Sequence, residues 1–173
     1  MLADFSSLIA ATARWLACAY PPGGGALATA LCEAQARQAV TVAAWLRYPT
    51  PMDAALVSLA GPGGSARLDW ITGADSGEAA GADGWRTWVD EVVASWAACL
   101  LTDPGLAARG VAAVTEGEHA PVIPLGFRRL TDPDTHDQRA AALLRHPDLL
   151  APVATLHRAD LLERLGHDEA LIA

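Results

Sequence analysis

Apolar residues recur three or four positions apart along most of the chain, which is the spacing of amphipathic helices. The longest runs predict helices over residues 5–19, 26–47, 51–60, 85–101, 104–114, 133–145 and 148–165. A short strand is an alternative only at Arg67–Thr72 and within residues 117–131. The pattern therefore predicts an all-α protein of five to seven helices, arranged as a compact multi-helix bundle or as a short array of helical hairpins.

Proline, glycine and capping residues mark the ends of these helices. Thr50-Pro51 and Asp103-Pro104 each place a capping side chain before a proline at the first helical position. Asp132-Pro133 repeats this pattern, so Asp132 is predicted to cap the helix that reaches residue 145. Gly166 is predicted to end the last helix, because glycine commonly follows the final helical turn.

The length predicts one helical domain over residues 1–173. A subdivision is an alternative, with apolar hairpins over 1–64, an acidic loop over 65–84 and a C-terminal helical part over 85–173 that includes a proline-rich loop. Trp-Leu pairs precede Tyr20-Pro21 and Tyr48-Pro49, which indicates either a degenerate helical repeat or a chance echo.

Composition excludes several classes of function. The chain has no lysine and no asparagine, which removes Schiff-base chemistry, the Walker phosphate loop and N-glycosylation. The bias toward residues with GC-rich codons indicates a bacterial or phage origin. The net charge of −8 argues against a nucleic-acid surface, and no run is long enough for a membrane span. The cysteines Cys18, Cys32 and Cys99 are predicted to be small buried residues in a cytoplasmic protein.

One cluster of acidic residues is a candidate metal-binding site. Asp132, Asp134, His136 and Asp137 have a spacing that places several oxygens and an imidazole on one loop, which is compatible with a metal-dependent enzyme. The simpler interpretation is that these carboxylates favour the positive end of a helix. We therefore expect no catalytic residues, no metal and no cofactor.

The first third of the chain is apolar and nearly uncharged, which is typical of a core or a protein interface. Leu2, Phe5 and Ile9 on the first helix, with Trp70 and Trp85 on either side of the acidic segment Gly73–Gly84, are the predicted interface residues. The expected partner is another protein or a second copy of the chain. The sequence favours a non-enzymatic interaction protein, acting as an adaptor, an assembly factor or a structural component of a larger complex. A cytoplasmic chaperone for one enzyme or secreted substrate is the alternative.

The chain is similar in size, in acidity and in an early helix ending at Tyr20-Pro21-Pro22 to the helical chaperones that mature molybdenum enzymes. That family carries a characteristic Pro-Asp-His segment in its later half. Here the corresponding residues read Pro133-Asp134-Thr135-His136, which is a different pattern. The sequence therefore does not assign the chain to that family.

Overall fold

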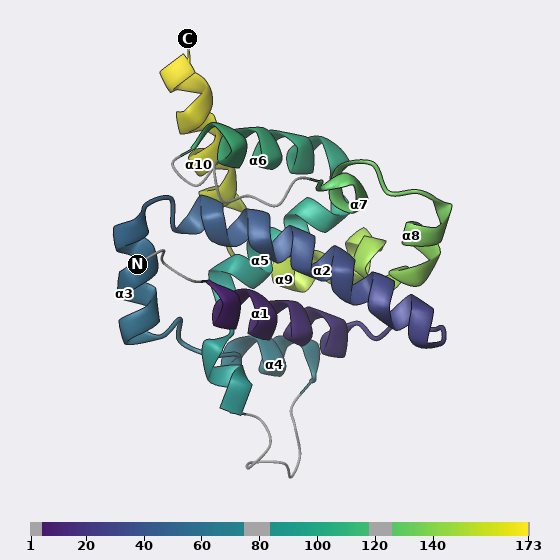
Figure 1. Cartoon of the computed structure of the whole chain (residues 1–173). Coiled ribbons are helices and arrows are strands. Elements are labelled where there is room, and N and C mark those ends of the chain that lie inside the picture. The colour runs from purple at the N-terminus through teal and green to yellow at the C-terminus, as the bar shows by residue number, and fades with distance from the viewer. Residues whose placement is uncertain (1–4, 75–83, 118–125, 173) are drawn as a thin grey trace.

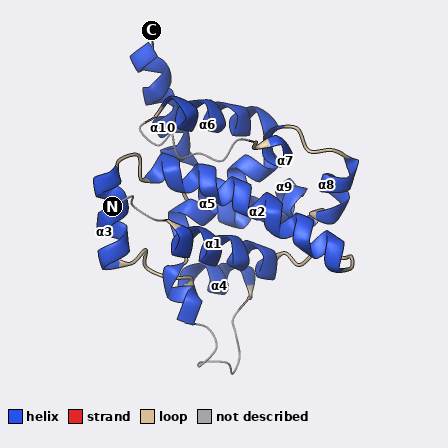
Figure 2. Cartoon of the chain, in the orientation of Figure 1, coloured by secondary structure: helices blue, strands red, loops and turns tan. Residues whose placement is uncertain are grey.

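The described residues of the computed structural model, 5–74, 84–117 and 126–172, form ten α-helices and no strand (Figures 1 and 2). The helices are α1 Ser6–Ala19, α2 Ala26–Arg47, α3 Pro51–Ala60, α4 Ala66–Thr72, α5 Glu91–Thr102, α6 Pro104–Glu116, α7 Arg128–Thr131, α8 Thr135–Ala140, α9 Pro147–Ala154 and α10 Arg158–Ile172, with 3-10 turns η1 at Gly84–Trp88 and η3 at Leu143–Arg145. The all-helical prediction is confirmed for this part of the chain. The predicted number of five to seven helices is wrong, because several predicted long helices are divided into short ones.

Helices α2 and α5 lie at the centre of the molecule, and α1, α6 and α9 pack around them (Figure 1). Their contact face is rich in alanine: Ala36, Ala39 and Ala43 on α2 and Ala94, Ala97 and Ala98 on α5 are fully buried. Alanine allows two helix backbones to approach closely. Gly110 has the same role on α6, because a Cβ at this position would lie 3.3 Å from side-chain atoms of Val42 and Leu100.

Helix α1 buries one face in this core, as its spacing predicts. Phe5, Leu8, Trp15 and Leu16 are buried, and the ring centroid of Phe5 lies 5.7 Å from that of Tyr48. Helices α2 and α3 begin and end where the sequence predicts. None of the helices in the described ranges has the length and hydropathy that a bilayer span requires.

The cap of α8 differs from the prediction. Asp132 ends α7, where its N–H donates to the carbonyl of Arg128. Asp134 is the N-cap: its side chain accepts from the N–H of Asp137, and the Asp137 carboxylate accepts from the N–H of Asp134. This reciprocal capping box lowers the pKa of Asp134, because the backbone N–H of Asp137 stabilises the charged form.

The helix predicted over Trp85–Leu101 is also corrected. Residues 84–88 form η1, and α5 begins only at Glu91, after an extended Asp90. The Asp90 carboxylate caps α5 by accepting from the N–H of Val93, and it accepts from the hydroxyl of Tyr48 at 2.5 Å. The apolar period continues through the break, so spacing alone does not reveal it.

The helix predicted over Asp148–Leu165 is divided into α9 and α10, and α10 continues past Gly166. Side chains of α5 stabilise the break. Ser95 donates to the carbonyl of Ala154 and accepts from the N–H of His157, and Trp96 Nε1 donates to the carbonyl of His157. Because α5 satisfies these backbone groups, the chain can leave the helical path here. The segment 65–84 is predicted as an acidic loop, but its first part forms helix α4, Ala66–Thr72. Residues 75–83 of that segment, and residues 118–125 of the predicted proline-rich loop, lie outside the described residues.

The cysteines divide into two environments. Cys32 and Cys99 are buried, as predicted, whereas Cys18 is exposed, because it lies on the outer face of α1. Burial, reinforced by Glu33, raises the pKa of Cys32 to about 11, and burial raises the pKa of Cys99.

We expect one thiol per chain to react rapidly with a maleimide in the folded protein, and the other two to react only after unfolding. Mass spectrometry of the labelled protein, with Cys18→Ser as the control, tests this expectation. Rapid labelling of two or three thiols in the native protein would contradict the burial of Cys32 and Cys99.

Candidate interaction surface

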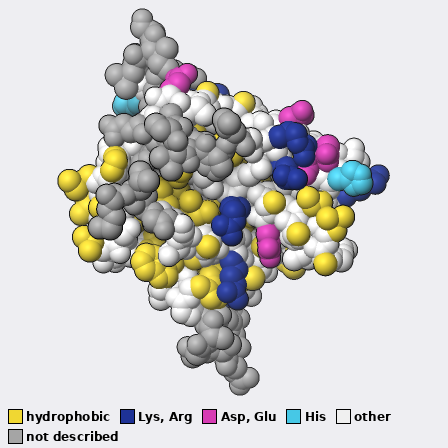
Figure 3. Space-filling view, viewed as in Figure 1, with side chains coloured by type: hydrophobic (Ala, Val, Ile, Leu, Met, Phe, Trp, Pro, Cys, Tyr) yellow, Lys and Arg dark blue, Asp and Glu magenta, His cyan; other side chains and the backbone are white. Residues whose placement is uncertain are grey.

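Helix α3 carries three large apolar side chains on its outer face. Met52, Leu56 and Leu59 are 68%, 57% and 86% exposed. They occupy positions i, i+4 and i+7, which lie on one side of a helix. In Figure 1 this helix stands at the edge of the molecule, and Figure 3 shows hydrophobic atoms gathered at the same edge. We call the row of Met52, Leu56 and Leu59 the α3 stripe.

Local interactions define the ends of α3. Thr50 and Asp53 form a reciprocal capping box: Thr50 Oγ1 accepts from the N–H of Asp53 at 3.2 Å, and Asp53 Oδ2 accepts from the N–H of Thr50 at 3.1 Å. Pro51 occupies the first helical position. Only Ala54 and Val57 are buried against the rest of the protein. The larger apolar residues of α3 thus face outward and the smaller ones inward.

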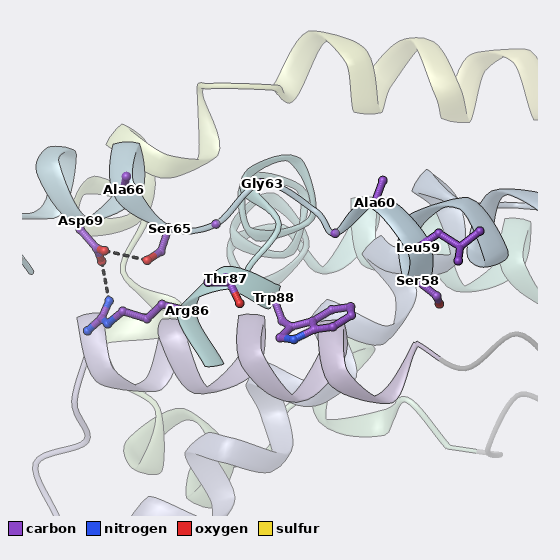
Figure 4. A pocket seen from close by; sticks show the side chains of 12 residues that line it. Ser58, Leu59, Ala60, Gly63, Ser65, Ala66, Asp69, Arg86, Thr87 and Trp88 are labelled. Carbon is purple, nitrogen blue, oxygen red and sulfur yellow. Dashed lines mark hydrogen bonds and ion pairs between the residues drawn. The ribbon is translucent and has the colours of Figure 1, made fainter. Parts of the chain in front are cut away.

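The connector from α3 to α4 depends on glycine. Gly61, Gly63 and Gly64 have φ values of 74°, 106° and 91°, a region that residues with a Cβ rarely adopt. This path leaves a groove of about 670 Å³ between the end of α3, the connector and η1 (Figure 4). Its lining includes Leu59, Ala60 and Trp88 beside the α3 stripe.

The opposite end of the groove is polar and centred on Asp69 (Figure 4). This carboxylate accepts from Ser65 Oγ at 2.7 Å and from Trp15 Nε1 at 2.8 Å, and it forms an ion pair of 2.8 Å with Arg86. Asp69 is buried, and its three partners come from α1, η1 and the residue before α4. The cluster fixes the position of η1 and therefore the shape of the groove.

The five predicted interface residues occupy different environments. Trp70 is 82% exposed on α4, and Trp85 is half-buried in η1. Phe5 lies in the core, Ile9 is half-buried against it, and Leu2 lies outside the described residues. The guanidinium carbons of Arg14 and Arg86 lie 4.5 Å and 4.9 Å from the Trp85 ring centroid, which makes Trp85 an anchor for two cations within the protein.

The acidic residues considered for metal binding have structural roles. Asp134 and Asp137 form the capping box of α8, and the buried Asp137 also forms ion pairs with Arg128 and Arg129 at 2.9 Å and 3.3 Å. His136 is exposed on α8. Within residues 5–74, 84–117 and 126–167, no three potential ligands among His, Cys, Asp and Glu are grouped closely enough to hold a metal ion.

The residues of the α3 stripe are not among the interface residues predicted from the sequence. The helix itself is predicted correctly, and the spacing of Met52, Leu56 and Leu59 is visible in the sequence. The spacing of Ala54 and Val57 is equally compatible with an apolar inner face, so the pattern does not show which side faces solvent. No protein-family model matches the chain, and neither a curated protein nor a solved structure is significantly similar to it.

Proposed function

We propose that this chain is a non-enzymatic helical interaction protein that binds another protein through the α3 stripe and the adjacent groove. In this role it acts as an adaptor, an assembly factor or a structural component of a larger complex. The observation that carries the proposal is the outward orientation of Met52, Leu56 and Leu59 on one helix. Contiguous exposed apolar side chains of this kind mark association surfaces in water-soluble proteins.

The chemistry of the surface favours a protein as the ligand. The stripe is a ridge that runs along a helix, and ridges of this type pack against a helix or an extended segment of a partner. Asp53 is the only charged residue between Tyr48 and Ser65, and its carboxylate is engaged in the capping box. A phosphate-rich ligand would instead require clustered positive charge.

The substitution Leu56→Glu is expected to reduce partner capture at least tenfold, because it places a charge at the centre of the apolar stripe. The measurement is quantitative capture from the host of origin, with the wild-type chain and the variant compared at equal concentration. Leu27→Glu is the matched control, since Leu27 is 73% exposed at the start of α2, far from α3 in Figure 1. Equal capture by all three proteins, with unchanged melting, would contradict the proposal.

A chaperone for an apolar segment of one client is the second candidate function. The groove beside the stripe supports it, because this groove combines an apolar end at Leu59 and Trp88 with a polar end at Asp69 and Arg86. An extended peptide presents both apolar side chains and backbone hydrogen-bonding groups. A chaperone releases its client after maturation, whereas an adaptor stays in the final complex, so the lifetime of the captured complex separates the two.

A further inference from the structure

We propose that a groove between the start of α2 and α8 binds a small amphipathic anion, namely an aliphatic carboxylate. The aliphatic chain lies against Leu27 and Leu143, and the carboxylate faces Arg139, since all three side chains line this groove. We call it the α2–α8 groove. The inference is independent of the proposed function, because no residue of the α2–α8 groove belongs to α3 or to the groove beside the α3 stripe.

The α2–α8 groove is formed by segments that are distant in the sequence. Its volume of about 570 Å³ lies within the range of small-molecule binding sites. Leu27 and Leu31 lie one helical turn apart on α2, and His136 and Arg139 lie one turn apart on α8. The two helices pack against each other (Figure 1), and the connector before α2 lines a further part of the groove. Two helix faces thus form its long walls.

The walls of the α2–α8 groove are mainly apolar. Leu27 is 73% exposed, Leu143 is 36% exposed, and Leu31 is half-buried. These side chains contact water in the free protein, so a ligand chain that covers them is stabilised by the apolar area that it removes from water. The α3 stripe is a ridge, whereas these residues line a recess. A recess of this kind encloses a narrow aliphatic chain.

The charge of the α2–α8 groove differs from that of the whole protein. No aspartate or glutamate lines the groove, although the chain has 20 acidic and 12 basic residues. Arg139 is exposed, and among the described residues it forms no ion pair. The acids beside it on α8 are already engaged: Asp134 and Asp137 form the capping box and pair with Arg128. The Arg139 guanidinium is therefore available to an anionic ligand.

Two further groups favour an anion at the same groove. His136 presents a ring N–H donor in either tautomer. The first turn of α2 contains no acidic residue, and its N-cap, Gly25, has no side chain to bond the first N–H groups, so the positive end of this helix dipole also favours an anion. Figure 3 shows basic and histidine side chains next to hydrophobic ones at the edge where α8 lies. One guanidinium with one further donor matches a single carboxylate.

This composition discriminates among classes of ligand. A cationic amphiphile is repelled by Arg139, and an uncharged one gains only the apolar contacts. A polyphosphate requires clustered positive charge, which the groove lacks. The combination of a long apolar wall with one fixed cation is met by an aliphatic carboxylate.

An NMR titration of the isotope-labelled full chain with decanoate tests the inference. Saturable shifts are expected at about millimolar decanoate, as for a ligand of this size, and they are expected to concentrate on residues 21–31 and 136–143. Hexanoate is expected to bind about tenfold more weakly or worse, because it buries fewer methylene groups. Decylamine, which has the same chain and a positive charge, is the ligand control. Equal affinity for decanoate and decylamine, or shifts centred elsewhere, would overturn the inference.

Two exposed positions supply variants that leave the core untouched. Arg139→Gln is expected to weaken decanoate binding about tenfold, because it removes a charge-assisted hydrogen bond. Arg37→Gln is the matched control, since Arg37 is an exposed arginine of α2 that does not line this groove. Leu27→Glu is expected to abolish binding, because it places a carboxylate in the groove. The NMR spectra verify that each variant is folded. Equal losses for Arg139→Gln and Arg37→Gln would reduce the effect to net charge and refute a specific site.

The same variants separate this inference from the proposed function. Leu27→Glu is expected to lose decanoate and keep protein capture, and Leu56→Glu is expected to lose capture and keep decanoate. If Leu27→Glu still binds decanoate as the wild type does, the inference fails whatever the capture assay shows. If Leu56→Glu keeps capture while Leu27→Glu loses decanoate, the proposed function fails and the inference stands.

Discussion

Asp69→Ala is expected to lower the free energy of unfolding by about 3–5 kcal/mol, which is the usual effect of removing one partner of a buried ion pair. The Asp69 carboxylate is the shared acceptor for Trp15, Ser65 and Arg86. Without it, the indole N–H of the fully buried Trp15 and the guanidinium of Arg86 lose their shared acceptor. Each lost hydrogen bond leaves a desolvated donor whose cost is not recovered.

Chemical denaturation of the variant and the wild type measures this effect. Asp69→Asn should be milder, because the amide oxygen still accepts from Trp15, although the ion pair is lost. Glu33→Ala is the matched control, since Glu33 is an exposed acid on α2 and such changes stay within about 0.5 kcal/mol. A loss below about 1 kcal/mol for Asp69→Ala would show that the carboxylate does not hold η1 against α1 and α4.

Arg145→Met is expected to lower the free energy of unfolding by about 2–4 kcal/mol, because it removes the donors for several buried acceptors. Arg145 Nε and Nη2 donate to Gln35 Oε1 at 3.3 Å and 3.1 Å, and Nη1 donates to the carbonyl of Leu101 at 3.0 Å. Arg145 Nη2 also donates to the carbonyl of Arg129. Burial lowers the pKa of Arg145, which shows that the charge is costly to hold here and moderates the net loss.

The same denaturation assay applies, with Arg139→Met as the control on the exposed side of α8. Gln35→Leu should produce a comparable loss, because Gln35 Nε2 also donates to the carbonyl of Asp137 at 2.7 Å. The double variant should lose less than the sum of the two single losses, since both side chains belong to one network. Strict additivity would contradict the view that Gln35 and Arg145 act as a unit.

Local signals predicted the first part of the fold well. The boundaries of α2 and α3 follow from Gly25, Tyr48, Thr50-Pro51 and Gly61, whose effects on the backbone are local. The breaks before α5 and between α9 and α10 depend on distant partners. The hydroxyl of Thr12 accepts from the N–H of Asp90, and Ser95 satisfies backbone groups of Ala154 and His157. Such long-range hydrogen bonds leave no periodic signal in the sequence.

The candidate surface was harder to predict than the fold. The near absence of charge in the first third of the chain predicts an interface on the first helix. In the structure Phe5 lies in the core and Ile9 is half-buried, while the exposed apolar row lies on α3. A helix whose two faces are both apolar does not reveal its orientation by spacing. Trp70 is 82% exposed and stays a predicted interface residue. It lies on α4, and the α3 stripe does not depend on it.

Site-specific photo-cross-linking in the host of origin tests the central claim most directly. A photoreactive amino acid at position 52, 56 or 59 is expected to give discrete protein adducts, while the same group at Leu27 is expected to give none or far fewer. Adducts of twice the chain mass indicate a second copy, and adducts of another mass indicate a different partner; either result supports the α3 stripe as an interaction surface. The absence of adducts at all three α3 positions, in cells where the chain is folded and expressed, would contradict the account.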